Sequence, residues 1–478
     1  MNTLPNENKC QLTIKTLSLK SDVNECELSP LDLFTPLSTK PWSIWLDSCD
    51  SDHVDSRFDI IVWQPEVTLC TYGDYTQVHQ AGALIATSYE DPLTLINKYQ
   101  NEVFKQYILP KLATNEELDL PFVGGSLGYF AYDLGRRFEA VPKIAQKDIE
   151  LPDMAIGIYS QAIIFDKNKN CCYLICPENS RQAITDFLRR ELKKIKPIEK
   201  FTLATQWKSN IDKNSYSEKF SQVKDYLLDG DCYQINLAQR FSAQYQGDEF
   251  QAYKALRISN NAPFSAFMRL DNDAAILSIS PERFLSVVGD KVQSKPIKGT
   301  LVRDADPVMD KKNAETLQQS SKDRAENVMI VDLLRNDISK VCQVGSVVVP
   351  ELFTVESFPA VHHLVSTVEG LLSKEFDNTD LLRGSFPGGS ITGAPKIRAM
   401  EIIEELEPHR RSVYCGSIGY ISTCGKMDTS ITIRTLVCQQ NTIHCWAGGG
   451  LVADSTLDSE YQETFDKVQK ILPVLSNL

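Results

Sequence analysis

Apolar and polar residues alternate over short runs between residues 40 and 176, which is the pattern of half-buried β-strands. Residues 92–109 interrupt this alternation and predict a helix. Gly124, Gly125 and Gly128 predict a tight loop that leads into another helix. The strands predicted in this region cover residues 42–46, 58–63, 67–72, 155–165 and 171–176.

Helices become more frequent after residue 176. Residues 182–195 are amphipathic, and residues 215–228 predict a further helix that Gly230 ends. The polar stretch between the two helices, residues 196–213, is the best candidate for a domain boundary. The remainder of the chain mixes strands and helices, which fits an α+β or an α/β fold without deciding between them.

These patterns predict three parts of unequal character. The first part lacks a clear pattern and reads as a tail. The second is rich in strands, and the third contains most of the candidate chemistry described below. We expect a tail over residues 1–28, a strand-rich domain over 29–200 and a second domain over 201–478, with sheets shared between the two domains.

Residues 280–303 predict a β-hairpin whose two ends carry a carboxylate, Glu282, and an amine, Lys298. Gly289 and Asp290 form the turn. A three-residue loop would place Glu282 directly opposite Lys298, whereas a two-residue loop would place them diagonally and on opposite faces. Taken alone, this stretch favours a surface salt bridge at a hairpin end.

The composition narrows the class of partner. The chain has 478 residues, 42% of them hydrophobic, and a net charge of −13. This balance argues against nucleic acid or an anionic membrane as a partner, although a local basic pocket can still bind an anionic small molecule. No apolar run approaches the length of a membrane span, and the polar N-terminus does not resemble a signal peptide. The 13 cysteines are therefore expected to be free thiols in the cytoplasm.

A set of carboxylates is the first candidate for a metal site. Glu460, Glu463 and Lys467 share one face of a predicted helix, and Glu326 begins another helix. Oxygen donors from two helices suit Mg²⁺. The commoner explanation for two glutamates one turn apart is an exposed, solvated helix face.

Two glycine-rich loops and one arginine complete the candidate chemistry. Residues 388–396 precede a predicted helix, and the free N–H groups of such a loop bind anions, although a plain turn is equally compatible. Residues 447–450 end a strand at a point where backbone or a ligand comes close. Arg434, on a predicted strand over 429–435, is either a carboxylate partner or an exposed charge.

Together these pieces resemble the chorismate-utilising enzymes, a family that includes the large components of anthranilate and aminodeoxychorismate synthases and the isochorismate and salicylate synthases. The resemblance implies an α+β fold in which antiparallel sheets pack on one another with helices outside. It covers nearly the whole chain after the tail. The matching motifs are residues 296–300, 323–337, 389–396, 427–435 and 448–463.

Two positions distinguish members of the family. Lys298 stands where anthranilate synthases usually carry alanine, and it matches the aminodeoxychorismate synthases. Gln234 stands where isochorismate and salicylate synthases carry a lysine that activates water. The resemblance therefore implies amination of chorismate at C4, with anthranilate synthase component I as the alternative.

The resemblance also implies a role for each matching residue. Lys298 would be a covalent nucleophile toward C2 of chorismate, and Glu282 would be the general acid for the C4 hydroxyl. Glu326, Glu460 and Glu463 would hold Mg²⁺. The substrate-binding residues that it implies are Arg434, Tyr414, Gly450, Thr392, Gly393, Lys467 and Gln234.

This chemistry sets conditions on two pKa values. A nucleophilic lysine must be neutral, so we expect the pKa of Lys298 to be lowered. A general acid must be protonated, so we expect burial to raise the pKa of Glu282. In the protein without substrate, we expect the two groups to form an ion pair instead.

Two further molecules are implied by the resemblance. The chain has no glutaminase motif, so ammonia would come from a glutamine amidotransferase, component II. The strand-rich domain of the family binds tryptophan, and the nearest match here is formed by Leu46, Ser48, Arg57 and Phe58. A non-catalytic, amino-acid-binding regulatory subunit is the alternative from another class, but it would not need the three glutamates.

Overall fold

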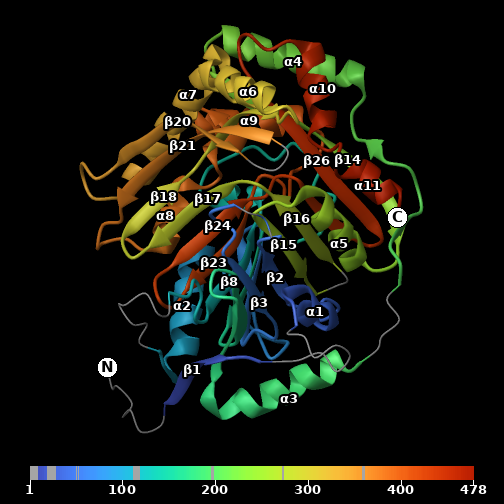
Figure 1. The fold of residues 1–478 in the computed structure, drawn as a ribbon. Coiled ribbons are helices and arrows are strands. Elements are labelled where there is room, and N and C mark those ends of the chain that lie inside the picture. Colours follow the sequence, from blue (N-terminus) through green and yellow to red (C-terminus); the bar gives the residue numbers. More distant parts are fainter. Residues whose placement is uncertain are drawn as a thin grey trace.

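The computed structural model describes residues 9–18, 28–49, 51, 53–110, 119–194, 199–271, 274–357 and 361–478. Two large β-sheets occupy the centre of the molecule, and helices lie on their outer sides (Figure 1). The first sheet contains, in order, β12 (Thr202–Leu203), β14 (Gln234–Gln246), β26 (Thr442–Leu451), β25 (Thr435–Gln439), β16 (Ala275–Ser280), β15 (Phe264–Arg269), β2 (Ile44–Asp47), β3 (Phe58–Val62), β10 (Ala162–Asp166), β11 (Cys171–Pro177), β1 (Cys10–Thr16) and β7 (Tyr107–Ile108), with β13 (Lys208–Ser209) and β22 (Gly393–Ala394) paired to β14.

The second sheet, like the first, combines strands from early and late parts of the chain. Its strand pairs are antiparallel, as are those of the first sheet apart from the parallel pair β1 and β7. Its strands are, in order, β19 (Ile297–Val302), β21 (Val361–Leu371), β18 (Lys291–Ser294), β17 (Arg283–Val288), β24 (Met427–Ile431), β23 (Ser417–Ser422), β8 (Gly125–Phe130), β9 (Met154–Tyr159), β4 (Val67–Tyr72), β5 (Tyr75–Gln80) and β6 (Ala83–Ser88), with β20 (Val348–Ser357) paired to β21.

The helices cover the sheets from several sides, and α4, α6, α7, α9 and α10 gather at one end of the molecule (Figure 1). Side-chain caps begin several of them: Asp91 accepts from the backbone of α2, and Ser320 accepts from the N–H of Asp323 in α7. The helices are α1 (Pro30–Phe34), α2 (Pro92–Phe104), α3 (Arg181–Leu192), α4 (Lys213–Leu228), α5 (Glu249–Asn260), α6 (Pro307–Gln319), α7 (Ser321–Ser339), α8 (Asn378–Ser385), α9 (Lys396–Leu406), α10 (Leu457–Asp466) and α11 (Leu472–Ser476), with short 3₁₀ turns η2 (Thr35–Leu37), η4 (Tyr132–Arg137), η5 (Glu178–Ser180) and η6 (Gly389–Ile391).

Both faces of the first sheet are buried. Along β2, Ile44 belongs to the large apolar cluster that also contains the second sheet, whereas Trp45 belongs to a separate cluster with α1 and α5. The same alternation places Ile60 and Ile61 of β3 in different clusters. Because successive side chains of a strand point to opposite faces, the first sheet is the middle layer of the protein.

Strands from both ends of the chain share each sheet. β2 pairs with β15 in the first sheet, and β8 pairs with β23 in the second. This interleaving agrees with the expectation of shared sheets, while the division into two domains at residue 200 stays a prediction. Part of the segment expected to be a tail differs from the prediction, because β1 pairs with β11 and buries Leu12 completely.

Three local predictions were wrong. The glycines at 124–128 do not lead into a helix but lie in or beside β8, where a Cβ on Gly125 or Gly128 would lie 2.3 or 2.0 Å from a backbone oxygen of the neighbouring strand. The glycines therefore allow close strand pairing. Residues 155–165 form two strands, β9 and β10, and the strand predicted over 429–435 ends at Ile431.

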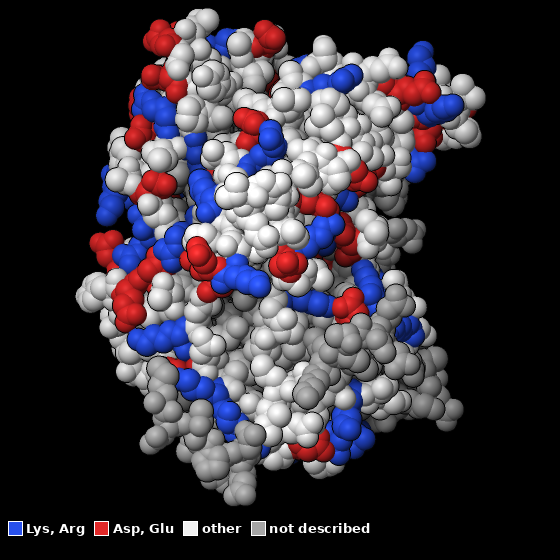
Figure 2. Space-filling view, turned by 90° about the vertical axis from the view of Figure 1, so that its left-hand side faces the viewer, with Lys and Arg blue, Asp and Glu red and all other residues white. Residues whose placement is uncertain are grey.

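The surface and the helices agree with the charge and hydropathy of the sequence. On the face drawn in Figure 2, basic and acidic side chains are interspersed rather than gathered into patches of one sign. Among the described helices, none is long and apolar enough to cross a membrane.

Candidate active site

Glu282 lies between β16 and β17, and its side chain is buried. Only 6% of its surface is exposed. Ser390 Oγ donates a hydrogen bond to its Oε1 at 3.3 Å. Burial raises the pKa of Glu282 to about 7, although the nearby charge of Lys298 opposes this rise. The carboxyl group is thus able to carry a proton near neutral pH, as a general acid requires.

Lys298 lies on β19, beside the loop that contains Ser390. Its Nζ donates to the carbonyl oxygen of Ser390 at 3.5 Å. Burial lowers the pKa of Lys298, although the charges of Glu326 and Glu282 oppose this change. Among the described residues, Lys298 and Glu282 form no ion pair, so the expectation that they pair without substrate was wrong: each instead forms a hydrogen bond with Ser390.

The path of the chain explains why the two groups share a site. Val288 pairs with Lys291, so the hairpin loop has two residues, the length that would place Glu282 and Lys298 on opposite faces. The return strand does not continue along β17. It is interrupted near Pro296, and β19 pairs with β21 instead, with a shift of register between Lys298 and Thr300. The partner strand β21 therefore sets the position of Lys298.

Arg434 is placed for binding a carboxylate. It lies in the turn between β24 and β25 with a left-handed φ of 49°. Burial lowers its pKa, which the charge of Glu282 partly opposes. Its guanidinium forms no hydrogen bond or ion pair with any other residue that the structure describes. A half-buried arginine without a partner among the described residues is able to bind a carboxylate ligand in a bidentate manner.

Gln234 has an equally unsatisfied side chain. It is completely buried, and both polar atoms of its amide lack a hydrogen-bond partner among the described residues. A Cβ on Gly450 would lie 2.9 Å from its Nε2, so the glycine makes room for the amide. Thr392 and Gly393 lie on the other side, where β22 pairs with β14. An unsatisfied amide in such a place fits contact with a polar ligand.

The three glutamates expected to hold Mg²⁺ lie near one another, but their carboxylates are too far apart to bind one ion as they stand. Among the described residues, no group of three possible ligands lies close enough to hold a metal ion. Burial raises the pKa of Glu326 and of Glu460, and in each case a neighbouring glutamate adds to the rise. Glu463 pairs with Lys467 at 2.6 Å. Partly buried carboxylates that repel one another fit a divalent cation, which would remove the repulsion.

The two remaining substrate-binding candidates are engaged within the protein. Lys467 Nζ donates to the carbonyl oxygen of Gly448 at 2.8 Å in addition to its bond with Glu463. Tyr414 is buried and stacks on Trp446, with ring centroids 5.9 Å apart and planes at 6°. Their proposed contacts with substrate stay predictions.

Two further residues lie near the site. Ser390 touches both Glu282 and Lys298, and the only sequence signal was its place in a glycine-rich loop. His363 lies on β21, with its Nδ1 2.8 Å from Thr300 Oγ1. Burial, together with the charge of Arg434, lowers its pKa to about 4, so this histidine is neutral.

Three of the four residues expected to bind tryptophan line one cavity. Leu46, Ser48 and Phe58 contribute to a cavity of about 90 Å³ between β2, β15 and β23. Arg57 does not line it, because its guanidinium forms two hydrogen bonds with Asp166 at 3.0 and 2.7 Å.

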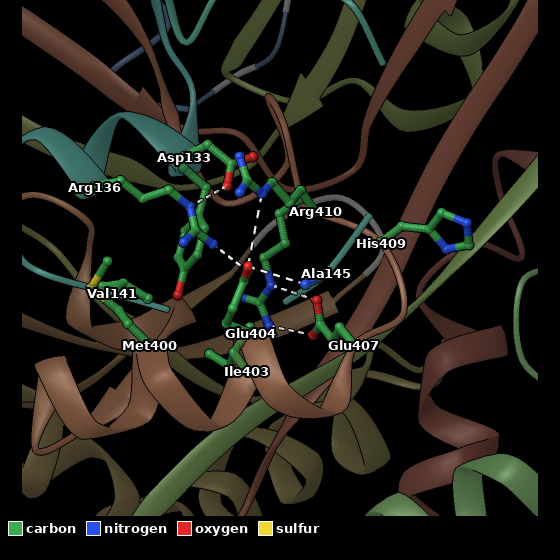
Figure 3. Close-up of a pocket in the computed structure, with 12 residues that line it drawn as sticks. Asp133, Arg136, Val141, Ala145, Met400, Ile403, Glu404, Glu407, His409 and Arg410 are labelled. Carbon is green, nitrogen blue, oxygen red and sulfur yellow. Dashed lines mark hydrogen bonds and ion pairs between the residues drawn. The ribbon is translucent and has the colours of Figure 1, made fainter. Parts of the chain in front are cut away.

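A buried ionic network contacts the glycine-rich loop of residues 388–396. Figure 3 shows Glu404 and Glu407 pointing from α9 and the segment after it toward arginine side chains. Arg411 pairs with Glu407 at 2.7 Å, and Glu404 accepts from Arg136. The cavity among these groups has a volume of about 10 Å³, room for one water molecule at most, so it is structural and not a substrate site.

Comparisons with known proteins agree with this geometry. A family model described as chorismate binding enzyme matches residues 47–473. The chain is 54% identical to aminodeoxychorismate synthase component 1 of Escherichia coli (strain K12) over 92% of this chain and 95% of that protein. It is 53% identical to the protein of the same name from Klebsiella aerogenes, over 93% and 96% of the two chains.

A solved structure has the same fold. The crystal structure of anthranilate synthase component I from Streptococcus pneumoniae TIGR4 is 31% identical, covers 88% of this chain and 93% of its own, and superposes with a TM-score of 0.76. The predicted α+β fold of packed antiparallel sheets is confirmed, as is the predicted family. The chain belongs to the family of chorismate-binding enzymes.

Proposed function

We propose that the chain converts chorismate and ammonia into 4-amino-4-deoxychorismate, on the route to 4-aminobenzoate and folate. The observation that carries this proposal is the presence at one loop residue, Ser390, of a lysine with a lowered pKa and a carboxyl group with a pKa raised to about 7. The names of the relatives that are 53–54% identical support it. Lys298 favours this reaction over that of anthranilate synthase.

The residues act in two displacement steps. Neutral Lys298 attacks C2 of chorismate, the two ring double bonds shift, and the C4 hydroxyl leaves as water with the proton of Glu282. Ammonia then attacks C4, the double bonds shift back, and the Lys298 amine leaves from C2. The product keeps its enolpyruvyl group. Glu282 gives one proton to the leaving hydroxyl and takes one back from the ammonium formed at C4, while Lys298 leaves with the protons it arrived with, so the net products are 4-amino-4-deoxychorismate and water.

Two separate sets of residues bind the two carboxylates of the substrate. Arg434, with the N–H of Gly450, Tyr414 and Lys467, receives the enolpyruvyl carboxylate, and Thr392, Gly393 and Gln234 line the ring. Glu326, Glu460 and Glu463 would hold Mg²⁺, which when bound neutralises the ring carboxylate. The raised pKa values of Glu326 and Glu460 support this assignment.

Product analysis tests the proposal. Purified protein is given chorismate, Mg²⁺ and ammonium, beside Lys298→Ala, Glu282→Gln and, as a control, Lys291→Ala at the exposed hairpin turn. Wild type and the control should form 4-amino-4-deoxychorismate, and the two site variants should not. Release of pyruvate with 2-aminobenzoate would show an anthranilate synthase and overturn our use of Lys298. Removal of Mg²⁺ by a chelator should abolish the reaction, and added Mg²⁺ should restore it.

The partner and the location are part of the same proposal. The relatives are named component 1, which supports a second component, and we propose a glutamine amidotransferase that supplies ammonia. The described cysteines form no disulfide, which supports the cytoplasm as the location. The cavity lined by Leu46, Ser48 and Phe58 is the candidate site for tryptophan, to be tested by calorimetry with Phe58→Ala as the non-binding variant.

A further inference from the structure

Ser390 lies in η6, on the glycine-rich loop between α8 and α9. It contacts both catalytic candidates through different atoms. Its hydroxyl donates to Glu282 Oε1 at 3.3 Å, and its carbonyl oxygen accepts from Lys298 Nζ at 3.5 Å. Glu282 precedes β17 and Lys298 lies on β19, two strands that do not pair with each other, and Ser390 contacts both residues.

The loop around Ser390 is fixed on both sides. A Cβ on Gly389 would lie 2.2 Å from Leu333 Cδ2, so the loop packs tightly on α7. Within the loop, Thr392 Oγ1 donates to the carbonyl oxygen of Gly388 at 2.8 Å. On the other side, Arg411 Nη1 donates to the carbonyl oxygen of Ile391 at 3.0 Å. The backbone of the loop is therefore held independently of the Ser390 hydroxyl.

Arg411 ties this loop to the first sheet. It is 1% exposed and donates to the carbonyl oxygen of Asn236 on β14 at 2.7 Å. Its partner Glu407, visible in Figure 3, accepts from the N–H of Ala238 at 2.9 Å. The ionic network thus places the loop relative to β14 as well as to α7.

We propose that Ser390 is a positioning residue that sets the general acid and the nucleophile relative to each other, an inference that rests on the roles proposed above for Glu282 and Lys298. The hydroxyl occupies one carboxyl oxygen of Glu282 and leaves Oε2 to carry the proton toward the leaving group. A carbonyl oxygen accepts only hydrogen, so it holds an N–H of Lys298 and leaves the lone pair free to attack.

The contact also affects the charge state of Glu282. The charged groups that face this carboxyl are Lys298 on β19, Arg434 in the turn after β24 and Lys467 after α10. The bond from Ser390, like these positive charges, favours the ionised carboxylate and lowers its pKa. Removing the hydroxyl therefore raises the pKa of Glu282 further, so the acid stays protonated to a higher pH.

The test compares Ser390→Ala with Ser390→Thr, which keeps a hydroxyl, in steady-state assays with chorismate, Mg²⁺ and ammonium across pH. Ser385→Ala is the matched control, because it removes a buried hydroxyl that has no partner among the described residues from the end of the preceding helix. We expect Ser390→Ala to lower kcat about 10- to 100-fold, the range for a lost hydrogen bond to a charged group, with little change in KM. The alkaline, falling limb of its kcat–pH profile should move to higher pH. Ser390→Thr should restore both kcat and the position of this limb.

Two results would overturn the inference. One is a kcat for Ser390→Ala within twofold of wild type, and the other is an equal loss in Ser385→Ala, which would indicate a general effect on the loop. Glu282→Gln and Lys298→Ala are measured in the same series. If these two stay active, the proposed catalytic roles fail; if they are inactive while Ser390→Ala is normal, only the role of Ser390 fails.

Discussion

Replacing Glu282 by glutamine should make the protein more stable at alkaline pH while it removes activity. The pKa of this buried carboxyl is raised from 4.5 to about 7 by burial. At about 1.4 kcal/mol per pKa unit, this difference corresponds to about 3 kcal/mol of folding free energy. Glutamine has the same shape and no charge, so it avoids this cost.

The sign follows from proton binding. The folded protein holds the Glu282 proton more tightly than the unfolded chain does, so the carboxyl contributes stability that is fully present below pH 4.5 and is lost as pH rises through about 7. The free energy of unfolding of Glu282→Gln, relative to wild type, should therefore increase by about 2.5 kcal/mol between pH 5 and pH 8. Urea unfolding followed by tryptophan fluorescence measures this difference. Because glutamine cannot donate the proton, kcat should fall about 100-fold or more.

Glu369, a glutamate whose pKa is lowered rather than raised, provides the control. Burial opposes ionisation of Glu369, but Lys291 and Gln293 outweigh it and lower its pKa, so it titrates below pH 4.5. Glu369→Gln should therefore differ from wild type by a constant amount between pH 5 and pH 8. If Glu282→Gln also showed a constant difference, the carboxyl would have an ordinary pKa, and the assignment of Glu282 as an acid would be refuted.

Three further changes have expected outcomes. Arg434→Lys loses bidentate geometry, so KM for chorismate should rise about tenfold or more while kcat changes less; an unchanged KM would place the substrate carboxylate elsewhere. Gly393→Ala should lower the free energy of unfolding by about 1–3 kcal/mol in urea, because φ is 139° and the new Cβ would lie 2.2 Å from the carbonyl oxygen of Gln234. Arg411→Met should cost about 3–5 kcal/mol by leaving Glu407 buried without its partner, and adding Glu407→Gln should recover part of the loss.

Much of the fold follows from local patterns in the sequence. The alternation at 67–72 predicts the bounds of β4, and the helix predicted over residues 215–228 covers most of α4. The glycines at 124–128 were misread because their role is set by strands far away in the chain, which come too close for a Cβ. No local pattern reports such a contact.

The site likewise combines features that local motifs predict with features that depend on distant parts of the chain. Motifs identify Lys298, Glu282 and Arg434 as chemical groups, but the hairpin alone gives the wrong relation between the first two. Their juxtaposition depends on β21, whose pairing begins more than 60 residues after Lys298. Ser390 gave no signal beyond its loop, because its importance lies in a hydroxyl and a carbonyl that meet groups from two other strands.

The interleaving of early and late strands has a consequence for synthesis. β8 is complete once residue 130 has left the ribosome, yet its neighbour β23 begins at residue 417. β2 likewise waits for β15, and the first sheet is completed only when β26 emerges at residue 451. The nascent chain must therefore keep apolar strand edges unpaired through most of translation, which makes it a substrate for chaperones and exposes truncated products to aggregation.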